Sequence, residues 1–260
     1  MRGPSTLLAI LLLGLSGSVH ASVDRRTVTW DQHPGAHLPL QLHFTDEAGR
    51  QVTLADYFGR TPVVLVLTYF SCPELCPMVL QGVGQALRST GLVAGRDYAL
   101  LAVSIDPRDT PAQARHEKSA LATSIPLLST AHFLTAADRS AASLAAALGF
   151  HYAYDAEHGQ FAHPAGFVII DRRGDINHYF FGIRYAAPQV RTAVLAASRG
   201  AAATLADQLL LLCYHFDPTQ GRYTLAIINV LRAVGIVAVL LGALGWWRLQ
   251  SSRVARDKPS

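Results

Sequence analysis

The chain has 260 residues, half of them hydrophobic, so it has room for one ordinary domain with appendages and is not an intrinsically disordered protein. The formal net charge is only +4, and part of that excess lies in a basic C-terminal tail. Since no basic stripe with interleaved aromatic residues occurs elsewhere, we expect no nucleic-acid partner.

The N-terminus has the pattern of a secretory signal peptide. Its apolar run, residues 7–15, is too short to cross the roughly 30 Å hydrocarbon layer of a membrane. Small residues at Val19 and Ala21 provide a cleavage site. We therefore predict that residues 1–21 are a cleaved signal, the alternative being an uncleaved anchor. Residues 22–200 are then an exported domain.

The first elements of this domain are an arm, a strand and a helix. A hairpin arm is expected at residues 40–44 and 51–54. Residues 62–70 form a continuous apolar and β-branched run, which is typical of a strand buried on both faces of a sheet. The helix that follows, residues 77–92, is expected to bury an apolar stripe that includes Met78.

The later elements continue the alternation of strands and helices. Thr110 is expected to cap a helix that has Pro111 at its first position. We further predict strands at 98–105 and 132–134, a helix at 138–148, a hairpin formed by 166–170 and 176–181, and a closing helix at 188–198. Parallel units followed by an antiparallel hairpin and a helix predict an α/β fold of the thioredoxin type.

The C-terminal part has the pattern of a membrane anchor. Residues 201–224 are expected to form a juxtamembrane helical segment. Residues 225–247 are apolar and long enough to span a bilayer, at roughly 35 Å as a helix. Trp246 and Trp247 mark one interface, and the basic tail, residues 248–260, is cytoplasmic by the positive-inside rule. The domain is then held on the extracytoplasmic (periplasmic) side of the inner membrane.

Two cysteines lie where the buried strand meets the first helix. Pro73 keeps Cys72 extended, and Pro77 favours a helix start with Cys76 at or near the cap. Both sulfurs are then close to a helix N-terminus, which favours thiolate over thiol. Such a pair can form a reversible disulfide or bind a soft metal ion, and a structural disulfide is a third possibility. The three-residue spacer favours a metal, and thiolates select copper(I) or zinc.

His163 is the favoured third ligand, because in folds of the thioredoxin type its loop, residues 159–164, faces the dithiol loop. An imidazole would complete a three-coordinate site that also tolerates copper(II). Cys213 and His215, just before the predicted membrane segment, are expected to be structural. The other histidines are expected to be exposed or structural: His33, His37 and His43 in the N-terminal arm, His116 and His132 in a helix and a strand, and His151, His158 and His178 at the surface.

Three motifs, in order, resemble the Sco/SenC family. They are residues 69–77, residues 104–111, and His163 placed before residues 167–171, within a match over about residues 40–195. The resemblance implies a thioredoxin-like fold with one copper ion bound by Cys72, Cys76 and His163. It also implies a role in assembling the dinuclear copper centre of cytochrome c oxidase. Pro164 departs from the small polar residue that typically follows the histidine.

The expected function is therefore that of a copper metallochaperone. Its partner would be the copper-bearing subunit of cytochrome c oxidase, and other copper chaperones or thioredoxin-like reductants would be upstream partners. The rival function is a thiol–disulfide oxidoreductase with Cys72 and Cys76 as the catalytic redox pair. A redox or copper sensor is the third alternative.

Overall fold

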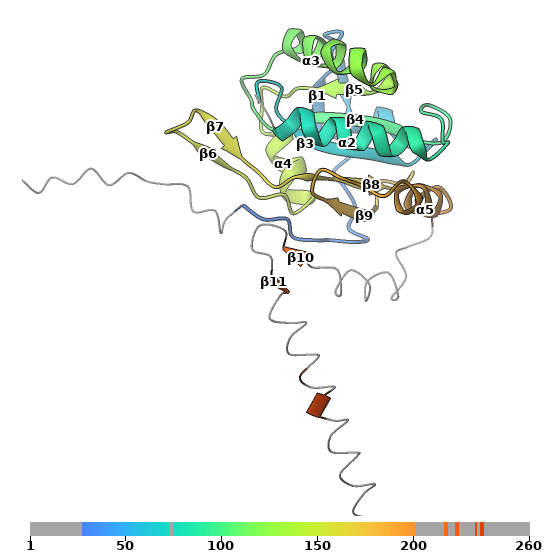
Figure 1. Cartoon of the computed structure of the whole chain (residues 1–260). Coiled ribbons are helices and arrows are strands. Elements are labelled where there is room, and N and C mark those ends of the chain that lie inside the picture. The colour runs from blue at the N-terminus through green and yellow to red at the C-terminus, as the bar shows by residue number, and fades with distance from the viewer. Residues whose placement is uncertain are drawn as a thin grey trace, which may run out of the picture. The chain divides into compact units, whose positions relative to one another are not determined.

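The computed structural model describes residues 28–72 and 75–200, together with residues 216–217, 222–223, 232 and 235–236 (Figure 1). The chain divides into two units, Met1–Gly200 and Ala201–Ser260. The three predicted functional residues, Cys72, Cys76 and His163, all belong to the first unit.

A five-stranded sheet forms the centre of the first unit, with the strand order β5-β4-β3-β8-β9. The strands are β3 (Val63–Thr68), β4 (Ala99–Ser104), β5 (His132–Leu134), β8 (Gly166–Ile170) and β9 (Ile176–Phe181). β3 pairs with β4 in parallel and with β8 antiparallel. All six residues of β3 are buried, as its unbroken apolar sequence predicts.

Helices and the N-terminal arm cover the two faces of this sheet (Figure 1). The helices α2 (Leu75–Ser89), α3 (Pro111–Ser124) and α5 (Ala187–Ser198) contribute to one core cluster, which includes Val64 and Val66. The helix α4 (Ser140–Ala147) and the arm contribute to the other cluster, which includes Leu65. Alternate residues of β3 therefore point into two separate cores, which makes this strand the rigid centre of the domain.

Two hairpins lie outside the central sheet. β1 (His43–Thr45) pairs with β2 (Gln51–Thr53), which leads into the 3-10 helix η2 (Leu54–Tyr57). β6 (Ala153–Asp155) pairs with β7 (Gln160–Ala162) and projects from the edge of the domain (Figure 1). A second 3-10 helix, η3 (Pro126–Thr130), connects α3 to β5.

The predicted elements occur in the predicted order, and the α/β fold of the thioredoxin type is confirmed. The cap at Thr110 is also confirmed, because its side chain accepts a hydrogen bond from the Gln113 N–H. α2 begins at Leu75, two residues before the predicted start, and Cys76 lies in its first turn, near the cap as expected. One local prediction was wrong. Met78 is 47% exposed and is not part of the buried stripe.

The hairpin β6–β7 was not predicted, and β7 occupies half of what was expected to be the loop at residues 159–164. Its strands have only three residues each, and all of these residues are half-buried or exposed. Such short strands carry too little hydrophobic periodicity to be recognised from the sequence.

The second unit contains β10 (Phe216–Asp217), which pairs antiparallel with β11 (Arg222–Tyr223). Over the described residues, no helix has the length and apolar character needed to span a membrane. The predicted signal at residues 1–21, almost all of the predicted anchor at 225–247, and Cys213 lie outside the described residues.

Candidate metal centre

The dithiol lies between the central strand and the first helix. β3 ends at Thr68, and the chain turns before α2 begins, with the Cys72 N–H donating to the Tyr69 carbonyl at 3.3 Å. Cys72 is half-buried and Cys76 is 2% exposed. Neither cysteine forms a disulfide. The sulfurs are therefore placed by the junction between a fully buried strand and a helix.

A buried carboxylate fixes the chain just before Cys72. The Phe70 N–H and the Ser104 hydroxyl both donate to Oδ2 of Asp109, each at 2.6 Å. Burial raises the pKa of Asp109, although these two hydrogen bonds oppose the shift. Asp109 thus connects the start of the dithiol turn to the end of β4.

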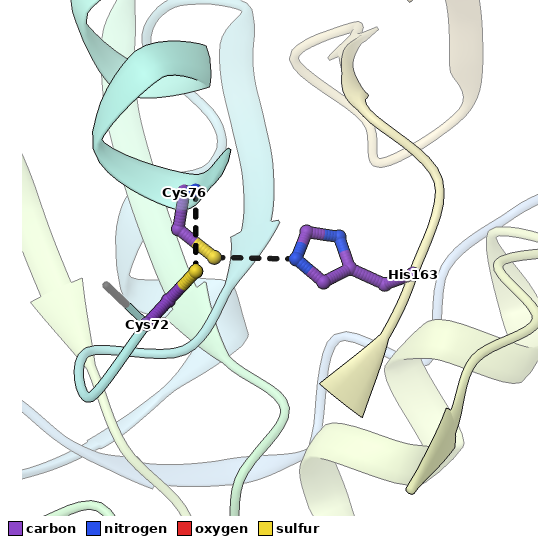
Figure 2. A group of neighbouring side chains, drawn as sticks. All are labelled: Cys72, Cys76 and His163. Carbon is purple, nitrogen blue, oxygen red and sulfur yellow. Dashed lines mark hydrogen bonds between the residues drawn. The ribbon is translucent and has the colours of Figure 1, made fainter. Parts of the chain in front are cut away.

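His163 completes a group of three potential ligands (Figure 2). Its Nε2 lies 3.2 Å from the Cys76 sulfur, and the Cys76 N–H donates to the Cys72 sulfur at 3.4 Å. The ligand atoms of Cys72, Cys76 and His163 all lie within 4.8 Å of one another. In Figure 2 the imidazole approaches from the segment opposite α2 and points its Nε2 at the Cys76 sulfur.

The tautomer of His163 follows from its second ring nitrogen. Nδ1 lies 3.0 Å from the Pro164 carbonyl oxygen, which can only accept a hydrogen bond. Nδ1 therefore carries the proton, and in the neutral ring Nε2 presents a lone pair towards the sulfurs. The ring is 8% exposed and packs against Tyr69 and Phe150, with centroid distances of 5.8 and 5.9 Å.

The pKa values of the two thiols are shifted in opposite directions. The hydrogen bond with the Cys76 side chain lowers the pKa of Cys72 most, and His163 and Tyr69 lower it further against partial burial. Burial raises the pKa of Cys76, and the neighbouring Cys72 side chain adds to this rise. Burial therefore opposes the thiolate form of Cys76, an effect that the expectation based on the helix N-terminus did not include.

Among the other histidines of the described chain, His116 and His132 lie in a helix and a strand and His151 and His158 are exposed, as predicted, whereas His178 is half-buried in β9. His33, His37 and His43 are exposed, and Nδ1 of His37 lies 2.8 Å from a carboxylate oxygen of Asp175. None of the three belongs to the ligand group formed by Cys72, Cys76 and His163. A second set of potential ligands, Asp155, Glu157 and His158, occurs beside the hairpin β6–β7, but Glu157 and His158 are exposed and nothing encloses them.

The structure adds residues that the sequence did not single out. Tyr69 packs between His163 and Phe161, and Asp109 fixes the dithiol turn. Asp106 is buried, and its carboxylate accepts a hydrogen bond from Arg108. The motif at residues 104–111 contained both aspartates, but nothing in its sequence showed which contacts they make.

A family model described as SCO1/SenC matches residues 31–196 of the chain. No curated protein matches this chain. Among solved structures, a protein of Aquifex aeolicus VF5 matches at 20% identity and a TM-score of 0.57, over 64% of this chain and 95% of that one. Copper-bound ScoI of Arabidopsis thaliana matches at 18% identity and a TM-score of 0.52, over 65% of this chain and 99% of that one. BsSco, which is described as having a disulfide switch, matches at 19% identity and a TM-score of 0.52, over 65% of this chain and 98% of that one.

These solved structures share the fold found here. The family model covers well over half of the chain and includes the dithiol turn, the hairpin β6–β7 and His163. The chain belongs to the SCO1/SenC family.

Proposed function

We propose that this protein binds copper through Cys72, Cys76 and His163 and delivers it to the dinuclear copper centre of cytochrome c oxidase. The observation that carries the proposal is the position of His163 Nε2, 3.2 Å from the Cys76 sulfur, with the ligand atoms of all three residues within 4.8 Å of one another. Two comparisons support it. The Arabidopsis ScoI structure has copper bound, and BsSco is described as a member of a family of cytochrome c oxidase assembly proteins.

The donor set suits this cargo. Two sulfurs and an imidazole are soft to intermediate ligands, which select copper(I) among common ions and also accept copper(II). Cys72 is half-buried rather than enclosed, so a partner's ligand can reach the site by exchange. A carrier needs such an opening, whereas a structural metal site is closed on all sides.

We also propose that the domain works outside the cytoplasmic membrane, held by an anchor at residues 225–247. The sequence alone supports this part: a signal pattern at residues 1–21, an apolar segment of spanning length, and a basic tail. Tethering would raise the effective concentration of the protein near a membrane-bound client.

The competing function is reduction of a client's disulfide, and the unequal burial of the thiols favours it as the second candidate. Half-buried Cys72 would attack the disulfide as a thiolate and form a mixed disulfide. Buried Cys76 would then attack Cys72, releasing the reduced client and leaving Cys72 and Cys76 oxidised. A thioredoxin-like reductant would restore the dithiol.

Titration of the reduced full-length protein with copper(I) against a chromophoric chelator tests the copper site. We expect one tight site in the wild type and weaker binding in His163→Ala. A very weak or sub-stoichiometric site, or tight binding that is unchanged in His163→Ala, would overturn the ligand assignment.

Oxidase assembly in cells separates the carrier from the reductase. The carrier function predicts that His163→Ala abolishes assembly of the copper centre while the purified variant still reduces a model disulfide. If His163→Ala impairs neither process, the delivery function is wrong.

A further inference from the structure

The position of His163 depends on how the hairpin β6–β7 sits on the domain. His163 is the first residue after β7, and β8 begins at Gly166. Within the described chain, β6 and β7 form a two-stranded sheet of their own, separate from the five-stranded sheet. Side-chain contacts rather than sheet hydrogen bonds must therefore set where the hairpin, and with it the imidazole, is held.

Arg108 makes such a contact from the loop between β4 and α3. Its Nε and Nη2 donate to the carboxylate of Asp106 at 2.9 and 2.8 Å, and this carboxylate is 2% exposed. The guanidinium carbon lies 5.0 Å from the ring centroid of Tyr154 and 5.7 Å from that of Phe161. Nη1 also donates to the Tyr154 hydroxyl at 3.4 Å. The buried carboxylate thus orients a cation over two aromatic rings of the hairpin.

These two rings connect Arg108 to the site. Tyr154 and Phe161 face each other across the hairpin, with centroids 5.1 Å apart. Phe161 is two residues before His163 and lies 5.6 Å from the ring of Tyr69. Tyr69 in turn packs edge-on against the imidazole at 5.8 Å. The path from Arg108 to the imidazole therefore consists of ring contacts that can be tested one by one.

We propose that Arg108 is a positioning residue, which clamps the hairpin β6–β7 onto the domain and so holds His163 Nε2 at the dithiol. Arginine suits this role because its planar guanidinium can bind a carboxylate through two nitrogens and stack on aromatic rings at the same time. The inference rests on the proposed copper-binding function for its affinity test, but the clamp itself is a property of the metal-free protein.

The chain offers a matched control at the turn between β8 and β9. Asp171 is buried and accepts from the backbone N–H and Nε of Arg173, two residues on, as Asp106 does from Arg108. The second contact of the Arg173 guanidinium is Asp175, at 3.2 Å, and it has no described contact with the hairpin. Arg173→Ala therefore removes the same kind of ion pair without removing a contact to β6 or β7.

Copper(I) affinity tests the clamp through a double-mutant cycle. We expect Arg108→Ala to weaken binding about tenfold, the lower end of the range for residues that orient a metal ligand, and Arg173→Ala to leave it unchanged. If Arg108 acts through the imidazole, adding Arg108→Ala to the His163→Ala variant should lower its copper(I) affinity little further. An unchanged affinity in Arg108→Ala, or an equal loss in both backgrounds, would overturn the proposal.

Hydrogen exchange of the metal-free protein supplies the second readout. Arg108→Ala should speed exchange of the amides at residues 153–163 and leave those of β3 and β4 unchanged, whereas Arg173→Ala should leave the hairpin unchanged. Arg108→Lys keeps the charge but not the planar fork, so it should give an intermediate result in both experiments. Wild-type protein that binds no copper would refute the proposed function, whereas unchanged hairpin exchange in Arg108→Ala would refute the clamp.

Discussion

The two halves of the site are built in different ways. The dithiol half lies between β3, whose six residues are all buried, and the first turn of α2, and Asp109 fixes the intervening turn. The histidine half follows a short hairpin whose residues are exposed or half-buried and whose strands pair with each other. Cys76 is thus part of the core and Cys72 packs against it, while the imidazole is held by ring contacts and, through Phe161, by one arginine.

The stability of the domain and the position of the third ligand therefore depend on separate contacts. Changes near the sulfurs should alter the free energy of unfolding as well as copper binding. Changes in the hairpin should alter copper binding with little effect on the free energy of unfolding.

Cys76→Ser should have the largest effect on copper. Serine has nearly the same shape as cysteine, but its hydroxyl is a poor ligand for copper(I). We expect the copper(I) affinity to fall by more than about 100-fold, the upper range for loss of an outer contact. Competition titration with a chelator measures it. Cys213→Ser is the matched control, and a similar loss there would mean that the ligand assignment omits a thiol.

Asp109→Ala should have the largest effect on folding. It leaves the Phe70 N–H and the Ser104 hydroxyl buried without their acceptor. Burying unpaired donors costs about 1–3 kcal/mol, so the free energy of unfolding in urea should fall by that amount. Asp109→Asn keeps one acceptor and should cost less. Asp97→Ala, which removes an exposed ion pair with Arg96 and the acceptor of the Val93 N–H, should cost less than Asp109→Ala, because water can replace these contacts. Equal losses for Asp109→Ala and Asp97→Ala would contradict the anchoring role.

The dithiol half could be predicted from the sequence because its signals are local. The apolar run at residues 62–70 predicts a central strand, and the two prolines around the cysteines predict a break after it and a helix start within two residues of the observed one. The unequal acidity of the thiols could not be predicted, because it depends on how deeply the tertiary packing buries Cys76.

The histidine half was predictable only in part. The family resemblance identified His163, but the hairpin before it has strands too short for a periodic pattern. The contacts of Arg108 with Tyr154 and Phe161 join residues about 50 positions apart in the chain. Without related sequences, nothing in the local pattern pairs such distant residues, so the clamp is visible only in the structure.

Phe161→Ala should weaken copper binding while sparing the core. It removes the ring between Arg108 and Tyr69, and one aromatic pair contributes about 0.5–1.5 kcal/mol. We therefore expect a loss of copper(I) affinity of about 2–12-fold, with unchanged hydrogen exchange in β3. Phe181→Ala, which removes an exposed ring that packs on Trp30, is the control and should not affect copper. If Phe161→Ala changed the hydrogen-exchange rates of β3 more than those of the hairpin, the separation of the two halves would be contradicted.

The smallest expected effect is an acid-dependent loss of stability at Asp106. Burial alone would raise the pKa of Asp106, but hydrogen bonds from Arg108 outweigh it, and the pKa lies below its ordinary value of 3.8. Because the folded pKa is lowered, this carboxylate stabilises the fold above about pH 4, and its contribution is lost as the pH falls through the folded pKa.

Other carboxylates titrate in the same range, so the measurement must compare two proteins. The difference in free energy of unfolding between wild type and Asp106→Asn should be constant from pH 7 to 5 and should shrink below pH 3.8 by at most about 1 kcal/mol, because Arg108 is largely exposed. Relative to the intrinsic rate at each pH, amide hydrogen exchange in the hairpin should become faster over the same interval in the wild type only. The reason is that a neutral Asp106 no longer orients the guanidinium. A difference in unfolding free energy that stays constant down to pH 2.5, or that grows, would show that the Asp106–Arg108 pair holds neither the loop nor the hairpin.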